Sequence, residues 1–156
     1  MAEGPKVGDA APDFDLETDQ GRLRRSDLGG KIVVLYFYPK DDTPGCTNEA
    51  IGFSQAQAEF EKAGAVVIGV SKDSVKRHAN FRAKHGLTVG LGSDPEGEMI
   101  QRYGVWVEKT LYGRQYMGIE RATFLIGRDG LIHRVWRKVK VPGHVAEVLA
   151  AVKGLG

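Results

Sequence analysis

The single cysteine of this chain lies in a segment whose residue types favour thiolate chemistry. Cys46 ends the sequence PKDDTPGC at residues 39–46, which joins an apolar run to a stretch with helical spacing. Thr43 suits the N-cap of a helix and Pro44 its first position, so Cys46 is expected in the first helical turn. Backbone N–H groups there have no helical partners, and the helix dipole also stabilises an anion. The sequence therefore predicts a reactive thiolate, whereas the simpler interpretation is a buried core cysteine.

The whole chain has the length and composition of one globular domain. It has 156 residues, so a single domain over residues 1–156 is expected, with a core that needs no disulfides. Hydrophobic residues make up 42% of the chain and charged residues 27%, which is typical of a globular protein. The 22 basic and 20 acidic residues leave a formal charge of +2, which is too small to predict a nucleic-acid or membrane partner.

The sequence also favours a reducing compartment. No apolar run approaches the roughly 20 residues that cross a bilayer, and the first six residues lack the apolar core of a signal peptide. One cysteine cannot form an internal disulfide. We therefore expect a cytoplasmic protein.

Hydrophobic periodicity predicts the elements that position Cys46. The apolar run at residues 32–38 indicates a strand covered on both faces. A helix is expected from residue 44 to 63, with Phe53 and Phe60 on its apolar face. The other expected elements are a strand–turn–strand unit before residue 30, a buried strand at 65–70, a helix at 74–85 capped by Ser74, an extended piece at 87–93, a short helix at 95–103, a β-hairpin of 123–126 and 131–136, and a helix at 142–152.

This order predicts an α/β protein with a thioredoxin-like fold. A parallel βαβ unit, an antiparallel hairpin and a last helix would give a central mixed β-sheet flanked by helices, with an N-terminal strand extension. Within the helix at 74–85 we expect Val75, Ala79 and Phe81 to face inward, and His78 and His85 to lie on the surface. Residues 106–119 alternate only in places and could be a loop with strand pieces.

The segment around Cys46 resembles the active-site signature of the peroxiredoxin Q family, also called bacterioferritin comigratory protein. The resemblance is carried by FYPKDDTPGCTNEA at residues 37–50, with GDAAPDF at 8–14, GVSKDS at 69–74 and ATFLI at 122–126. It implies the thioredoxin-like fold and a thiol peroxidase. Cys46 would attack the terminal oxygen of hydrogen peroxide or an organic hydroperoxide, giving a sulfenic acid and water or an alcohol.

The resemblance also implies roles for four other residues. The Thr43 hydroxyl would hydrogen-bond the thiolate or the peroxide, and Pro39 would shield the cysteine from water. Arg121 would stabilise the thiolate and the leaving oxygen, and Glu49 would hold Arg121. Each has a simpler structural interpretation: an N-cap for Thr43, a strand end for Pro39, a rim position for Arg121, and an acid that complements the helix dipole for Glu49.

The chain lacks the second, resolving cysteine of many relatives. Ile51 stands five residues after Cys46, and Arg82 stands near the other usual position in the next helix. The resemblance then implies a one-cysteine mechanism, in which an external thiol such as thioredoxin, glutaredoxin or glutathione attacks the sulfenic acid. Cys46 should be prone to further oxidation. Because no disulfide has to form between residues roughly 7.5 Å apart along a helix, the helix start should move less than in two-cysteine relatives.

Two other classes of function remain open from the sequence. A cysteine hydrolase would need a histidine base, but the four histidines are scattered: His78, His85, His133 and His144. A non-catalytic thioredoxin-like binding module would explain the fold but not the match at Thr43, Cys46 and Arg121. No metal-ligand spacing or phosphate loop is present, so neither a metal nor a cofactor is expected. We expect a monomer or homodimer. Four aromatic residues could wall a site for organic hydroperoxides, although such residues more often form core: Phe53, Trp106, Tyr112 and Tyr116.

Overall fold

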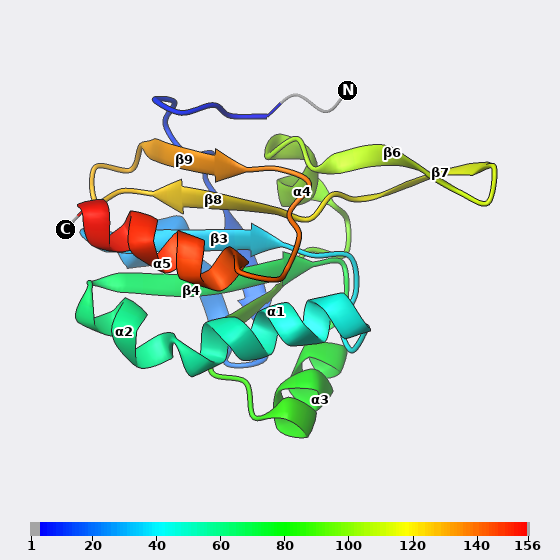
Figure 1. The fold of residues 1–156 in the computed structure, drawn as a ribbon, viewed down its shortest axis with the longest axis horizontal. Coiled ribbons are helices and arrows are strands. Elements are labelled where there is room, and N and C mark those ends of the chain that lie inside the picture. Colours follow the sequence, from blue (N-terminus) through cyan, green and yellow to red (C-terminus); the bar gives the residue numbers. More distant parts are fainter. Residues whose placement is uncertain (1–3, 156) are drawn as a thin grey trace.

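A computed structural model describes residues 4–155, which form a seven-stranded mixed β-sheet with helices against it and a separate two-stranded hairpin (Figure 1). The strands are β1 Asp15–Thr18, β2 Gly21–Arg24, β3 Ile32–Phe37, β4 Ala65–Ser71, β5 Gly90–Ser93, β6 Trp106–Leu111, β7 Arg114–Ile119, β8 Ala122–Ile126 and β9 Ile132–Trp136. The helices are the 3₁₀ turn η1 Arg25–Leu28, α1 Pro44–Gln55, α2 Gln57–Lys62, α3 Val75–His85, α4 Glu98–Arg102 and α5 His144–Leu155.

The sheet has the order β2-β1-β5-β4-β3-β8-β9. The strands β3, β4 and β5 are parallel, and the remaining pairs are antiparallel. The predicted central mixed sheet with added N-terminal strands is therefore confirmed.

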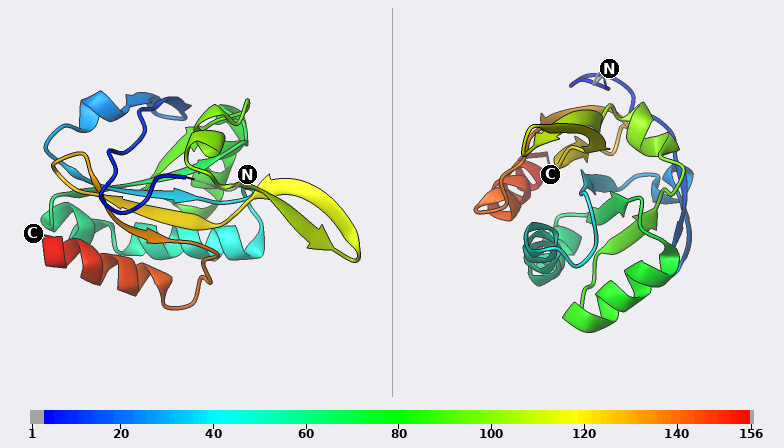
Figure 2. Two further views of the ribbon diagram at one scale, coloured as in Figure 1. Left: turned by 90° about the horizontal axis from the view of Figure 1, so that it is seen from above. Right: turned by 90° about the vertical axis from the view of Figure 1, so that its right-hand side faces the viewer.

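The apolar run at 32–38 is buried on both faces, as predicted. Val33, Leu35 and Phe37 of β3 belong to one core cluster, which α4 and the N-terminal segment cover. Val34 and Tyr36 belong to a second cluster on the opposite face. Side chains from α1, α2, α3 and α5 complete this second cluster, and these helices lie on that side of the sheet in Figure 2. Successive side chains of β3 point to opposite faces of the sheet, so this one strand contributes to two separate core clusters.

Residues 44–63, expected as one helix, form two. The helix α1 ends at Gln55 and α2 begins at Gln57, because Ala56 leaves the helical conformation, with φ −90° and ψ 3°. Across this bend the rings of Phe53 and Phe60 lie 5.9 Å apart, and both are fully buried. No Gly or Pro marks the break, so helical periodicity alone did not reveal it.

The helix α3 begins as expected but presents a different face to the core. The Ser74 hydroxyl accepts a hydrogen bond from the Arg77 backbone N–H at 3.2 Å, which confirms the cap. The expectations that Ala79 faces inward and that His78 lies on the surface are wrong, since His78 is fully buried and Ala79 is exposed. The buried imidazole finds polar partners, chiefly Asp41, so its burial leaves no unpaired group.

The remaining helices keep their predicted order with shifted ends. The short helix α4 covers 98–102 rather than 95–103, and α5 covers 144–155 rather than 142–152. Phe81 is buried as expected, whereas Val75 and His85 are half-buried. No helix among residues 4–155 is both long and apolar enough to cross a membrane.

Residues 106–119, for which the sequence left loop and strands open, form the hairpin β6–β7. Its strands pair from Trp106 opposite Ile119 to the tip, where Tyr112 and Gly113 adopt positive φ of 51° and 76°. Two such residues give a turn that matches the twist of a hairpin. The hairpin projects from the body of the protein (Figures 1 and 2). Arg121 is the second residue after the hairpin, so the base of the hairpin lies close in sequence to a predicted site residue.

Candidate active site

Cys46 is the third residue of α1, and this helix starts where the chain returns from the end of β3. Thr43 occupies the predicted N-cap position with an extended backbone, and its carbonyl accepts the first helical hydrogen bond, from the Thr47 N–H at 2.8 Å. The Cys46 side chain is only 1% exposed and belongs to the core cluster beneath α1. The thiol is thus at a helix N-terminus, as predicted, and also largely covered.

Arg121 connects the thiol to a buried carboxylate. Its Nη2 donates to Cys46 Sγ at 3.3 Å, and its Nη1 donates to Glu49 Oε1 at 2.7 Å. Glu49 is one helical turn after Cys46 on the same side of α1 and is fully buried. The structure therefore brings together three of the five predicted site residues, although Arg121 lies far from the other two in the sequence.

The charges in this group are coupled. Burial raises the pKa of Glu49 to about 7, although the positive charge of Arg121 and its hydrogen bond act in the opposite direction. Burial also works against the charge of Arg121, but the negative charges of Glu49 and Cys46 outweigh it and raise the pKa of the guanidinium. Glu49 Oε2 is buried and has no hydrogen-bond partner among the described residues. A carboxyl group so placed changes charge near neutral pH while Arg121 stays a cation.

Gly45 leaves room for the Arg121 guanidinium. A β-carbon placed at Gly45 would lie 3.1 Å from Arg121 Nη2, closer than ordinary van der Waals contact. The same nitrogen donates to Cys46 Sγ. Pro44 therefore suits the backbone of the first helical position, and Gly45 leaves space for the Arg121 side chain.

Thr43 and Pro39 lie in the loop before α1. Among residues 4–155, no hydrogen bond joins either of them to the Cys46 sulfur. The Thr43 hydroxyl donates to the Lys40 carbonyl at 2.9 Å rather than capping the helix. Tyr38 N–H donates to the Val70 carbonyl, and Pro39, which has no N–H, then ends this ladder and is exposed. The strand-end interpretation of Pro39 therefore fits its position.

A buried polar network holds the loop that carries these residues. Asp41, 2% exposed, pairs with His78 Nδ1 at 2.6 Å and accepts from the Tyr38 hydroxyl at 2.6 Å. The Asp41 N–H donates to Asp73 Oδ2 at 2.8 Å. Sequence reasoning missed this network, because nothing in the helical pattern of α3 indicated that His78 turns inward. Its only signal was Asp41 itself, a charged residue within the signature segment.

No histidine is arranged as a base for Cys46. The two buried histidines are engaged elsewhere, His78 with Asp41 and His144 Nε2 with Thr123 Oγ1 at 2.8 Å. Within residues 4–155 no group of three or more His, Cys, Asp or Glu side chains could hold a metal ion. The cysteine–histidine pair that a cysteine hydrolase would need is therefore not formed by these histidines.

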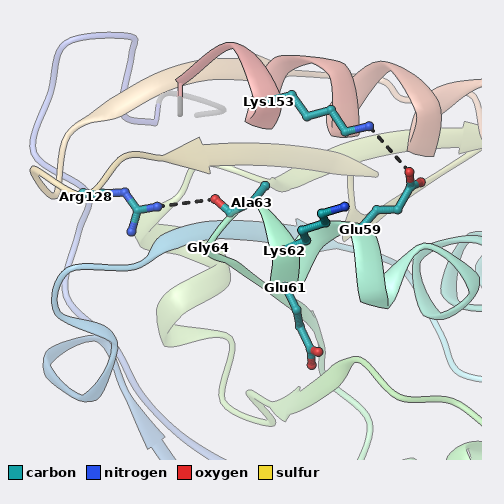
Figure 3. Close-up of a pocket in the computed structure, with 7 residues that line it drawn as sticks. All are labelled: Glu59, Glu61, Lys62, Ala63, Gly64, Arg128 and Lys153. Atoms are coloured by element: carbon teal, nitrogen blue, oxygen red, sulfur yellow. Dashed lines mark hydrogen bonds and ion pairs between the residues drawn. The ribbon is translucent and has the colours of Figure 1, made fainter.

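The hollow in Figure 3 is remote from this chemistry. It measures about 580 Å³ and is lined by charged residues of both signs, including Glu59, Arg128 and Lys153. It lies near the start of β3, where the Ile32 N–H donates to the Gly64 carbonyl, whereas Cys46 follows the other end of that strand. This hollow is therefore not the mouth of the thiol site.

Comparisons with known proteins agree on one family. The model of the AhpC/TSA family matches residues 7–135. The chain is 47% identical over 151 residues to peroxiredoxin Bcp of Bacillus subtilis, which covers 96% of each chain. It is 52% identical over 124 residues to peroxiredoxin Bcp of Xanthomonas campestris, covering 80% of this chain and 78% of the relative.

The solved structures give the same result. The bacterioferritin comigratory protein of Xanthomonas campestris, solved in work on its alkyl peroxide reduction activity, has 44% identity, a TM-score of 0.88 and 96% coverage of both chains. Solved forms of peroxiredoxin Q from that organism include serine substitutions at two different cysteines, so that relative has more than one. The thioredoxin-like peroxiredoxin fold is therefore confirmed, and so is the resemblance found in the signature. The chain belongs to the AhpC/TSA family as a one-cysteine member of its peroxiredoxin Q (Bcp) group, and it is a thiol-dependent peroxidase.

Proposed function

We propose that Cys46 is the peroxidatic cysteine and that Arg121 is the cation that supports it. The Cys46 thiolate attacks the terminal oxygen of a hydroperoxide, an S–O bond forms, and the O–O bond breaks. Two electrons pass from sulfur to the peroxide, the leaving oxygen takes one proton from solvent, and the products are a sulfenic acid and water or an alcohol. The observation that carries this proposal is the guanidinium of Arg121, which donates to Cys46 Sγ and Glu49 Oε1 at once.

The physical argument concerns where charge moves. The reacting sulfur starts as an anion and the leaving oxygen ends with the negative charge, so a fixed cation beside both lowers the barrier. Glu49 orients Arg121 by occupying its other nitrogen, which limits the rotation of the guanidinium. The donor set thus exists before peroxide arrives.

Thr43 and Pro39 act on the substrate side of the same loop. The Thr43 hydroxyl, now donating to a backbone carbonyl, can rotate to donate to a bound peroxide oxygen. Pro39 lies two residues after the end of β3 and has no N–H, so it brings no competing backbone donor to the loop. Both roles rest on the resemblance and on the position of this loop directly before α1.

Recycling uses a thiol from outside the chain. Cys46 is the only cysteine, so its sulfenic acid has no internal partner. An external thiolate, from thioredoxin, glutaredoxin or glutathione, attacks the sulfenic sulfur. An S–S bond forms, the S–O bond breaks, and the departing hydroxide takes a proton from solvent to leave as water. A second thiol then resolves the mixed disulfide. We propose that the protein works as a single thioredoxin-like domain, as a monomer or homodimer, in the cytoplasm.

The test is peroxide consumption with each thiol donor in turn. Wild type should consume hydrogen peroxide with at least one donor, Cys46→Ser should consume none, and Arg121→Met should be slowed about 10²-fold or more, as when one donor to a developing charge is removed. The matched control is Arg128→Met, which removes a guanidinium at the opposite end of β3. Peroxide loss by Cys46→Ser at the wild-type rate would end the assignment.

A further inference from the structure

Lys109 is a half-buried cation that the roles above do not use. It lies in β6 opposite Tyr116, on the same hairpin face as Gly118. A β-carbon at Gly118 would be 3.3 Å from Lys109 Cδ, so the absent side chain leaves room for the lysine stem. Gly118 is closer to the hairpin base than Tyr116, so the stem runs toward the base, where Arg121 follows.

The Lys109 ammonium group has no direct partner. No hydrogen bond or ion pair joins it to any of residues 4–155. Burial lowers its pKa, as does the positive charge of Arg121, whereas the negative charges of Cys46 and Glu120 raise it. A partly desolvated, unpaired charge costs stability, so its retention within electrostatic reach of the reactive sulfur calls for an explanation.

The charges around Lys109 leave one anion for it to balance. Glu120 Oε2 already accepts from Arg137 Nε at 2.8 Å and from the Lys138 N–H at 3.2 Å. Arg121 shares its charge between Glu49 and Cys46. Above about pH 7, where Glu49 is ionised, the Arg121–Glu49 pair is formally neutral, so the negative charge on the Cys46 sulfur has no full counter-charge.

We propose that Lys109 is a second cation of the peroxidase site, which with Arg121 stabilises the negative charge on Cys46 Sγ and on the oxygen that leaves when the peroxide bond breaks. This rests on the proposed function of Cys46. Lys109 acts through its field and transfers no proton or electron. The hairpin, which the sequence did not resolve, thereby acquires a chemical role, because it directs this charge toward its base, near Arg121.

The test uses three variants and two reactions. Lys109→Met keeps the length of the stem without its charge, Lys109→Arg keeps the charge, and Arg114→Gln removes a charge from the tip of the same hairpin. Rapid mixing measures the rate constant of Cys46 oxidation by hydrogen peroxide. Alkylation by iodoacetamide, followed over a range of pH, measures the thiolate without any peroxide.

Lys109→Met should slow both reactions about threefold to tenfold near neutral pH, as expected for one charge acting near a protein surface. Its alkylation curve should move to higher pH. Its melting temperature should not fall, because burial and Arg121 disfavour the Lys109 charge more than Cys46 and Glu120 favour it. Lys109→Arg should stay within about twofold of wild type, and Arg114→Gln should be unchanged.

Three results would overturn the inference. These are wild-type rates in Lys109→Met, equal slowing in Arg114→Gln, and equal slowing in Lys109→Arg, which would indicate packing rather than charge. The two reactions separate this inference from the proposed function. If wild type failed to consume peroxide, the proposed function would fail, yet slower alkylation in Lys109→Met would still establish the action of Lys109 on Cys46.

Discussion

Replacing Glu49 by glutamine should change how the stability of the protein depends on pH. Glu49 is fully buried, and its pKa in the folded protein is about 7 against an ordinary 4.5. Between these two pH values the folded state keeps a proton that the unfolded state has lost. The stabilising contribution is therefore complete below about pH 4.5 and is lost as pH rises through about 7. The difference, at about 1.4 kcal/mol per pH unit, is about 3 kcal/mol.

Glutamine has nearly the shape of glutamic acid and can still accept from Arg121 through its amide oxygen, but it does not titrate. Urea unfolding of wild type and Glu49→Gln at several pH values should therefore show wild type losing about 3 kcal/mol relative to the variant between about pH 4.5 and pH 8. Subtracting the two curves cancels the other titrating groups. The reason is the cost of placing an ionised carboxylate in a dry site that Arg121 compensates only in part.

The control for this experiment is Glu59→Gln. Glu59 is exposed and forms only a 3.5 Å ion pair with Lys153, so its removal should cost less than about 1 kcal/mol at any of these pH values. If the difference between wild type and Glu49→Gln stayed flat across the range, Glu49 would be ionised throughout. Burial would then not raise the pKa of Glu49.

Three further changes follow from the same geometry. Cys46→Ser should abolish peroxide consumption while leaving the circular dichroism spectrum and melting temperature close to wild type, and loss of the fold would contradict its role as a reacting group. Gly45→Ala should slow Cys46 oxidation about tenfold in stopped-flow measurements, because the new methyl group would lie 3.1 Å from Arg121 Nη2 and push the guanidinium away from Cys46 Sγ. An unchanged rate would show that this donor is dispensable. His78→Leu should lower the free energy of unfolding by about 3 kcal/mol in urea titrations, because it leaves Asp41 buried without the imidazole that lies 2.6 Å from its Oδ2. A cost below about 1 kcal/mol would mean that water replaces the imidazole.

The elements of the fold could be predicted where local pattern and tertiary structure agree. The apolar run at 32–38, the Ser74 cap and the hairpin of β8 and β9 each depend on neighbours in the sequence, and each is found. No local signal marks the break at Ala56, across which the buried rings of Phe53 and Phe60 lie 5.9 Å apart. Tertiary packing overrode a sequence that favours one continuous helix.

The site, too, contains residues that the local sequence could predict and residues that it could not. The position of Cys46 follows from the chain around it, because capping residues and a strand end define the helix start. Arg121 lies between β7 and β8, far from Cys46 in the sequence. Its spacing alone indicated only a rim arginine, so the prediction that it lies beside the sulfur came from the family resemblance. Neither pattern nor resemblance indicated His78 or Lys109, because their importance comes from what the fold packs against them.

The absence of a second thiol has consequences throughout this structure. Arg82, which stands near one usual position of a resolving cysteine, binds Asp19 and the carbonyls of Leu87 and Val89, at 2.8 and 2.7 Å. The end of α3 is thereby tied to the segment that follows it, where a two-cysteine mechanism would need it to move. With no second cysteine in the chain, the cycle needs an external thiol to reach Cys46.

That approach meets a sulfur that is 1% exposed. Hydrogen peroxide has two heavy atoms and needs little room, whereas a reducing thiol brings a whole molecule to the same sulfur. The loop before α1 must therefore open more for reduction than for oxidation, and this opening works against the contacts of Asp41 with Tyr38 and His78. We expect the loop network to limit recycling rather than peroxide cleavage, so that the sulfenic acid accumulates during turnover and further oxidation competes with its rescue.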